Sequence, residues 1–353
     1  MALVATLALM TACSSTQGPK SAASGLALTV LAVRDEVKSA AGQVSDLKAW
    51  GNYAVWIESD SATGFGKTMV LRDTARHSSR VIAAAPAGKF IDLVDASGHT
   101  IVYLVAQYQQ ANAGQDVTWA IEAVDVYGSS TVQVATSAAS DNFFFVPQPR
   151  IDGDWVAWSQ VIPGSTSSSA DFLEAVAYQL STGKKHVITQ RRNPYSVSVT
   201  GRMVYYSGNS AAGSDLFAKP VDHEAEAVQV TTSSQVSYLS AGGGGVVWQE
   251  PTRGAPQALW ALEGAQPHKF IKISGPNRGS AVTNGSWAAW VSSTDTLQLA
   301  AFKDPAHPFT VAGNDLYIAA RWSMTASSLA WATRPTAGGG REPITIHVAT
   351  LRS

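Results

Sequence analysis

Short apolar runs bounded by turn residues recur along the chain, and seven of them share one pattern. Each copy has a glycine, two variable positions, two apolar residues and an aromatic residue. The first positions of successive copies lie 47, 55, 48, 42, 42 and 41 residues apart. A period of about 40–50 residues is the range of β-propellers, with one four-stranded blade per repeat. The copies span residues 51–56, 98–103, 153–158, 201–206, 243–248, 285–290 and 326–331, the last with Ala326 in place of glycine.

Further strand-like runs surround each copy, so each repeat predicts four strands. Around the fourth copy they are residues 195–199, 215–219 and 227–231. A glycine supplies the positive φ that the tight turn between the first two strands commonly needs. Strands covered on both faces show apolar runs instead of strict alternation. Because blades diverge with radius, the repeated aromatic is expected to fill the gap between neighbours. The alternative, a β-sandwich with coincidental Trp spacing, does not explain seven copies in register.

The last repeat ends one strand short, because only residues 316–321, 329–333 and 344–350 are strand-like in it. The segment Leu28–Val33 precedes the first repeat and has no other assignment. We expect it to supply the missing outer strand, which would leave no open sheet edge. The sequence therefore predicts an all-β, seven-bladed β-propeller closed by an N-terminal strand. The alternative is six blades with one irregular terminal unit.

The repeats resemble the TolB-like (WD40-like, PD40) bacterial propellers over residues 45–351. In that family a Pro-Asp-Gly turn precedes a strand that ends in Trp or a similar residue. Here the turns are Ala-Ser-Gly98, Ile-Asp-Gly153, Val-Thr-Gly201 and Thr-Asn-Gly285. The resemblance implies the propeller fold. TolB itself carries an α/β domain before its propeller, for which this chain has no room, so its partner role is not carried over.

The N-terminus predicts an export signal. Residues 2–12 form an apolar run of 11 residues, whereas a membrane-spanning helix needs roughly 20. The following Met10–Cys13 resembles the lipobox of bacterial lipoproteins, in which the cysteine is lipidated. Cys13 is the one cysteine, so no intramolecular disulfide forms. We expect a signal peptide over 1–12, a flexible tether over 13–24 and a propeller over 25–353. The alternative is an ordinary secretory signal with an incidental cysteine.

Composition and charge narrow the classes of partner. With 25 Lys+Arg against 26 Asp+Glu, the net charge is −1, which excludes binding to nucleic acid by bulk charge. The 45% apolar content is too high for a disordered chain and supports a large core.

The sequence offers little for catalysis. Its seven histidines are spread over the predicted ring, which argues against a histidine metal site or a Ser-His-Asp triad. None of the common nucleophile, zinc or phosphate-loop motifs is present. The predicted inner strands carry mainly Ser, Val, Thr and Ala, with Asp92 and Asp152 as the nearest acids. We therefore predict no catalytic residue, no metal and no cofactor.

Binding is better supported than catalysis. In a propeller the connections from second to third strands, and from one blade to the next, share one face around the channel. On this face three consecutive phenylalanines, residues 143–145, cannot all face one side of a sheet, and exposed aromatics can mark an interaction site. The predicted ligand-binding residues are Tyr108, Phe143, Phe144, Arg191, Arg192, Arg253, Arg278 and Arg334.

These observations predict a lipoprotein of the bacterial cell envelope, facing the periplasm or exterior and held to the membrane through Cys13. Its propeller is expected to bind an envelope protein, peptide or glycan without catalysis, or to act as an assembly scaffold. The alternative is an extracellular glycoside hydrolase or polysaccharide lyase. Those reactions need paired carboxylates, or a base with a metal, at the channel.

Overall fold

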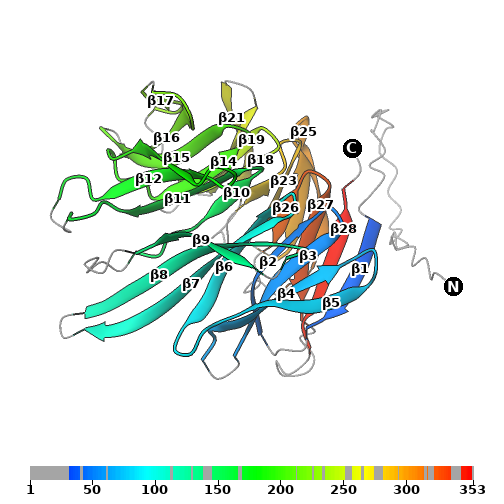
Figure 1. Ribbon diagram of the computed structural model, residues 1–353. Coiled ribbons are helices and arrows are strands. Elements are labelled where there is room, and N and C mark those ends of the chain that lie inside the picture. The colour runs from blue at the N-terminus through cyan, green and yellow to red at the C-terminus, as the bar shows by residue number, and fades with distance from the viewer. Residues whose placement is uncertain are drawn as a thin grey trace, which may run out of the picture.

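A computed structural model gives the structure of the protein. It describes residues 32–39, 43–60, 63–111, 114–128, 130–137, 145–165, 169–211, 213–224, 226–232, 235–250, 257–263, 266–273, 281–292, 294–313, 316, 322–334 and 343–351. In these residues the regular structure is all β, without a helix. Figure 1 shows the sheets fanned around a common centre, an arrangement that makes the chain a β-propeller.

Antiparallel four-stranded groups follow one another along the chain. The first two groups are β2 Gln43–Trp50, β3 Tyr53–Ser59, β4 Gly66–Asp73 and β5 Ser78–Ala84, then β6 Phe90–Ser97, β7 Thr100–Ala111, β8 Gly114–Asp125 and β9 Thr131–Thr136. The next two are β10 Arg150–Asp152, β11 Trp155–Val161, β12 Leu173–Gln179 and β13 Lys184–Thr189, then β14 Ser196–Thr200, β15 Met203–Ser210, β16 Gly213–Pro220 and β17 Val228–Gln229.

The remaining groups complete the architecture. They are β18 Ser237–Gly242, β19 Gly245–Glu250, β20 Gln257–Glu263 and β21 Gln266–Ile273, then β22 Val282–Thr283, β23 Trp287–Val291, β24 Leu297–Ala301 and β25 Asp304–Ala312. The last sheet holds β26 Ser323–Thr325, β27 Ser328–Thr333, β28 Thr345–Thr350 and the N-terminal β1 Ala32–Lys38.

The first two groups are joined into one eight-stranded sheet where Gly66 of β4 pairs with Ile91 of β6. A Cβ on Gly66 would lie 2.1 Å from the carbonyl oxygen of Ile91 and 2.5 Å from Ile57 Cγ2. Glycine is therefore needed at position 66 for this close approach of two backbones.

The first strands of the groups lie innermost and contact one another in chain order. They are β2, β6, β10, β14, β18, β22 and β26, and β26 also contacts β2. Each runs toward its repeat's turn, so the turns of the repeats gather at one end. We call this end the turn face. The opposite end carries the connections between second and third strands and between groups, and we call it the loop face.

The repeated aromatic residues are buried between neighbouring groups, as the sequence predicts. Trp158 packs with Leu104 and Val117 of the preceding group, and Trp248 packs with Tyr205 and Leu216. All seven are at most 5% exposed: Trp56, Tyr103, Trp158, Tyr206, Trp248, Trp290 and Trp331. These side chains supply much of the apolar area that holds adjacent sheets together.

The repeated glycines adopt the positive φ that the sequence predicts for the turn. Their φ values are 47° at Gly51, 61° at Gly98, 56° at Gly153, 59° at Gly201, 57° at Gly243 and 86° at Gly285. The seventh copy has Ala326, which is not among the residues with positive φ. The seventh repeat, which has alanine instead of glycine, is therefore the repeat whose turn does not require a positive φ at this position.

The N-terminal strand of the last sheet lies later in the chain than predicted. We expected residues 28–33, but the pairing strand is β1, Ala32–Lys38, which is antiparallel to β28. Figure 1 shows β1 in blue beside β28 in red. Residues 28–31 lie outside the described residues. Charged side chains such as Asp35 and Glu36 are suited to β1, because it is an outer strand and has polar partners in the first group and in β28.

Two of those charged side chains fix β1 to its neighbours. The carboxylate of Asp35, 7% exposed, accepts hydrogen bonds from Arg72 Nε at 2.7 Å and Nη2 at 3.1 Å. His77 Nδ1 lies 3.1 Å from the same carboxylate, and His347 Nδ1 lies 2.9 Å from Glu36 Oε1. Arg72 and His77 belong to the first group, so Asp35 joins the last sheet to the first.

The predicted signal peptide, the tether and Cys13 lie outside the described residues. The described part of the chain holds no helix of the length and apolarity needed to cross a membrane.

Candidate functional site

The loop face carries those predicted ligand-binding residues that the structure describes: Tyr108, Arg191, Arg192 and Arg334. Phe143, Phe144, Arg253 and Arg278 lie outside the described residues. Figure 1 shows that β7, which contains Tyr108, and β8 form a long hairpin at this face.

Tyr108 belongs to a cluster of three aromatic rings. Phe90 stacks on both Phe65 and Tyr108, with ring centroids 4.8 Å and 4.9 Å apart. Phe65 and Tyr108 are 5.5 Å apart, and they are 40% and 39% exposed while Phe90 is buried. Burial and the nearby Asp92 carboxylate raise the pKa of the Tyr108 hydroxyl, so this group is neutral at neutral pH. Two outer rings held by a buried third form a rigid apolar platform.

The sequence analysis named Tyr108 as a ligand-binding residue but did not name Phe65 or Phe90. The three residues come from the β3–β4 connection, the start of β6 and the end of β7. All three residues lie at strand ends on the loop face, and this shared position in the repeats is the sequence signal that could have grouped them.

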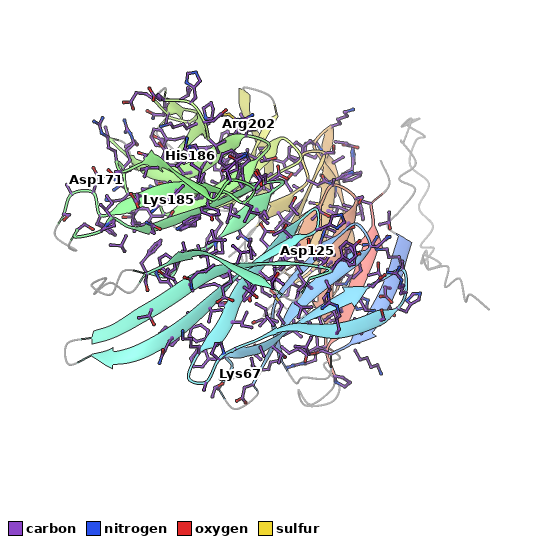
Figure 2. The ribbon with its side chains drawn as sticks, in the orientation of Figure 1. Lys67, Asp125, Asp171, Lys185, His186 and Arg202 are labelled. Carbon is purple, nitrogen blue, oxygen red and sulfur yellow. The ribbon has the colours of Figure 1, made fainter. Side chains whose placement is uncertain are left out.

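The two adjacent arginines lie together but differ in their contacts. Arg191 and Arg192 line a shallow depression with Asp171, which Figure 2 labels on the β11–β12 connection. The guanidinium of Arg192 lies 4.8 Å from the centroid of the Phe217 ring, and its backbone N–H donates to Asp171 Oδ1 at 2.7 Å. Both arginines are exposed, but Arg192 also has its guanidinium against the Phe217 ring.

Asn193 holds this connection in place. Its Oδ1 accepts from the backbone N–H groups of Phe172 and Leu173 at 2.6 Å and 3.1 Å, and its Nδ2 donates to Ala170 O at 2.8 Å. It is 2% exposed with a φ of 44°, a conformation that asparagine tolerates better than most residues. Arg334 begins the β27–β28 connection and is half-buried.

At the turn face, the side chain before the first position of a repeat bonds to the next repeat at or near its turn in six of the seven repeats, and in the fifth this position is Gly242, which has no side chain. Trp50 Nε1 donates to Gly98 O at 2.9 Å, and Ser97 Oγ accepts from Gly153 N at 2.9 Å. The same relation holds for Asp152 with Gly201 N, Thr200 with Gly244 N, Asn284 with Ala326 O, and Thr325 with Ala49 O. These bonds connect the first five repeats in sequence order, the sixth repeat to the seventh, and the seventh to the first.

The predicted inner-strand acids Asp92 and Asp152 lie on β6 and β10, and the inner strands carry two further acids that the sequence analysis did not name. Asp46 and Asp95 are 5% and 4% exposed on β2 and β6, and Asp152 lies at the end of β10. Asp46 Oδ2 accepts from Val94 N at 2.8 Å, and Asp95 Oδ2 accepts from Ile151 N at 3.1 Å. Each carboxylate therefore joins its strand to the next inner strand. This role depends on a residue of another repeat, so no local sequence motif indicates it.

Metal ligation finds no support in the described residues, which contain no group of three His, Cys, Asp or Glu side chains that could hold an ion.

The comparisons support the fold. No protein-family model matches the sequence, and no curated protein matches it. The Pyrococcus horikoshii acylaminoacyl peptidase is similar over 88% of this chain and 52% of that one, with a TM-score of 0.59 and 9% identity. The propeller domain of the Pyrococcus furiosus Trilobed protease covers 88% and 95%, with a TM-score of 0.60 and 8% identity.

TolB from Acinetobacter baumannii is also among the similar structures, at 84% of this chain and 64% of that one, with a TM-score of 0.48 and 11% identity. The chain thus spans between about half and two thirds of the TolB and acylaminoacyl peptidase structures that it matches. The likeness to the two Pyrococcus structures, at TM-scores of 0.59 and 0.60, shows the β-propeller fold.

Proposed function

We propose that the protein is a cell-envelope lipoprotein whose propeller is a non-catalytic binding module. In this proposal the ring has seven blades and is closed by β1, and a lipid on Cys13 tethers it. The loop face presents the ligand site for a protein, peptide or glycan. The observation that carries the binding role is the exposed aromatic platform of Phe65, Phe90 and Tyr108.

Three features support seven blades in a closed ring. The described strands fall into seven groups of four, if the eight-stranded sheet is divided at the Gly66–Ile91 pair. A core cluster joins Trp56 and Val44 of the first group to Ile344 and Ile346 beside or within β28. The turn bonds also return from Thr325 to Ala49.

The position of β1 suggests how an anchored ring would face the membrane. Ala32 pairs with Thr350, which pairs with Ser328 directly after the last turn, so β1 begins at the turn face. Eighteen residues separate Cys13 from Ala32. A lipid on Cys13 would therefore keep the turn face toward the membrane and leave the loop face available to partners.

The aromatic platform suits a ligand with flat apolar faces, such as a sugar ring or an aromatic or proline side chain. Rigid aromatic rings contribute contact area at low cost in conformational entropy, and they dominate many binding sites. The buried Phe90 ring holds the Phe65 and Tyr108 rings in place, so binding a ligand costs these side chains little conformational entropy.

The enzymatic alternative receives less support. Two carboxylates, Asp95 and Asp152, line a pocket between the inner strands at the turn face. Asp95 is paired with Lys48 at 2.6 Å, and Asp152 accepts the N–H of Gly201. Carboxylates engaged in this way are poor candidates for the paired acid and base of a glycosidase.

The binding role is tested on arrays of envelope glycans and short peptides, with the protein and a Phe65→Ala/Tyr108→Ala variant. We expect the best wild-type binder to lose at least about tenfold in affinity, the loss of about 1.4 kcal/mol typical of an interface anchor. Tyr127→Ala is the matched control, because Tyr127 is an exposed tyrosine that follows β8 at the turn face. Unchanged binding by the double variant, or no binder on either array, would contradict the proposal.

A further inference from the structure

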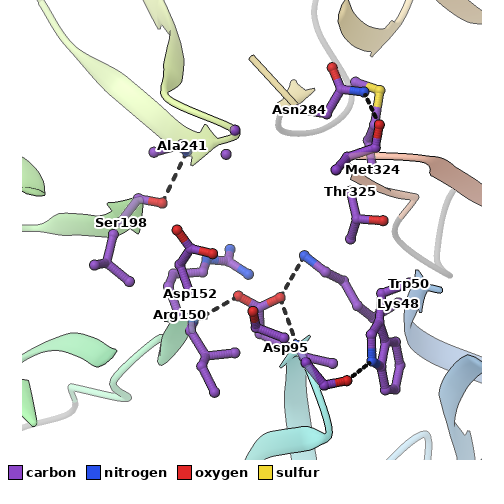
Figure 3. Close-up of a pocket in the computed structure, with 18 of the residues that line it drawn as sticks. Lys48, Trp50, Asp95, Arg150, Asp152, Ser198, Ala241, Asn284, Met324 and Thr325 are labelled. Atoms are coloured by element: carbon purple, nitrogen blue, oxygen red, sulfur yellow. Dashed lines mark hydrogen bonds and ion pairs between the residues drawn. The ribbon is translucent and has the colours of Figure 1, made fainter. Parts of the chain in front are cut away.

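A second candidate site lies in the channel at the turn face. A pocket of about 290 Å³ opens there among the inner strands. Every inner strand, or the residue next to it, contributes to its lining (Figure 3). Its volume is at the lower end of ligand pockets, so it accommodates one group of the size of an amino acid or a monosaccharide.

Three charged residues occupy equivalent positions on consecutive inner strands. Lys48, Asp95 and Arg150 each lie three residues before the first position of their repeat, and all three line the pocket. Lys48 Nζ lies 2.6 Å from Asp95 Oδ1, and Figure 3 shows the Lys48 ammonium pointing toward the middle of the pocket. The layer has two cations and one anion.

The two carboxylates that line the pocket, Asp95 and Asp152, already accept hydrogen bonds from the protein. Asp95 accepts from the N–H groups of Ala96 and Ile151 as well as from Lys48, and Asp152 Oδ2 accepts from Gly201 N. Their charge is therefore stabilised by the protein itself.

Arg150 differs from these groups. Among the residues that the structure describes, none forms a hydrogen bond or an ion pair with its guanidinium. A guanidinium has five N–H donors arranged to bind a carboxylate through two parallel bonds. The donors of the Arg150 guanidinium are therefore available to a ligand. The Lys48 ammonium uses one donor for Asp95 and has its others available.

We propose that this pocket binds a small ligand through a free carboxylate, with Arg150 as the anchoring group and Lys48 as the second cation. A bidentate pair between a carboxylate and a partly buried arginine is strong and specific in geometry. A metal cation would face the charges of Arg150 and Lys48 instead. The same chemistry occurs in a uronate sugar and in the C-terminal residue of a peptide.

The neutral part of the ligand also has partners in the pocket. Ser198 Oγ accepts from Ala241 N at 3.0 Å, which leaves its O–H to donate to a ligand oxygen. Asp152 Oδ1 forms no hydrogen bond with the described residues and can accept from a ligand hydroxyl or N–H.

This site is independent of the platform on the loop face, because the two lie at opposite ends of the inner strands. The Phe65→Ala/Tyr108→Ala variant is therefore expected to bind carboxylates as the wild type does, and failure of either site leaves the other in place.

The test is calorimetric titration of the protein with two acids and their neutral counterparts. The probes are glucuronate against glucose and N-acetyl-Ala-Ala against its C-terminal amide. We expect saturable binding of at least one acid, at least tenfold weaker binding of its neutral counterpart, and at least tenfold weaker binding of that acid by Arg150→Ala. Which acid binds distinguishes a uronate site from a peptide C-terminus site.

Arg202→Ala is the control for general positive charge, because Arg202 follows a turn of the same face, is exposed, and is outside the pocket lining. Arg150→Ala is expected to fold, since the Arg150 guanidinium makes no hydrogen bond or ion pair with described residues, and its thermal unfolding checks this. The proposal is overturned if neither acid binds saturably, if the neutral probes bind equally well, or if Arg202→Ala weakens binding as much as Arg150→Ala.

Discussion

Replacing Asp35 by alanine is expected to lower the free energy of unfolding by about 3 kcal/mol, the lower end of the cost of breaking a buried ion pair. Asp35 is the buried acceptor for Arg72 at the boundary between β1 and the first group. The lower end applies because Arg72 keeps its hydrogen bond to His77 O at 2.6 Å. Denaturant unfolding measures the loss, and hydrogen exchange measures the expected loss of protection in β1 and β28.

Asp222→Ala is the matched control, since Asp222 pairs with Arg202 but is 45% exposed at its side chain. We expect a change within about 0.5 kcal/mol for it, as for exposed pairs generally. Equal losses for the two variants, or a protected β1 in Asp35→Ala, would argue against a ring held closed at this boundary.

The contribution of Asp35 is also expected to depend on pH. Burial by itself would raise the pKa of Asp35, but hydrogen bonds from Arg72 and His77 outweigh burial and lower it below the ordinary value of 3.8. A carboxylate with a lowered folded-state pKa stabilises the protein above its unfolded-state pKa and loses this effect as pH falls through the folded-state value. The difference in stability between the wild type and Asp35→Asn should therefore be constant near neutral pH and shrink below about pH 4.

Gly243→Ala is expected to destabilise the protein by about 4 kcal/mol, as the sum of a strained backbone and an overpacked contact. Gly243 has a φ of 57°, and a Cβ there would lie 1.9 Å from Asn284 O and 2.7 Å from Asn284 C. Both neighbours are backbone atoms of the next turn, so the clash is relieved only if two repeats separate. Urea unfolding of the variant measures the cost.

Gly98→Ala separates the two causes. Gly98 has a φ of 61°, close to that of Gly243, but a Cβ on Gly98 would have no other atom within 4 Å. We expect a loss of about 1 kcal/mol from backbone strain alone. If both variants lost the same stability, the close contact of neighbouring turns would contribute nothing.

The repeat made the architecture predictable from the sequence. A period of aromatic residues with a glycine five positions earlier depends on local turn geometry and on packing between neighbours, which recur in every repeat. The terminal strand was harder to place. The prediction placed the strand at residues 28–33 because this segment is apolar. The observed β1 contains Asp35 and Glu36, and their partners Arg72 and His347 are distant in sequence, so the sequence pattern did not indicate this strand.

The candidate sites were predictable only in part. Tyr108 was named because the repeat places it in a loop-face connection, although the structure places it near the end of β7. Phe65 and Phe90 belong to other connections, and their stacking depends on tertiary structure. The charges of Lys48, Asp95 and Arg150 become visible when the repeats are aligned at the position three residues before the turn, since period-two alternation sends that position into the channel.

The central claim, a lipid-anchored propeller that serves as a binding module, is tested most directly by the intact mass of the protein extracted from membranes. We predict the mass of a chain that begins at Cys13 with a diacylglyceryl group and any further acyl chain added. The Cys13→Ala variant should lack this addition and leave the membrane fraction. An unmodified Cys13 in a protein recovered from the soluble fraction would contradict the anchor and favour a freely secreted binder.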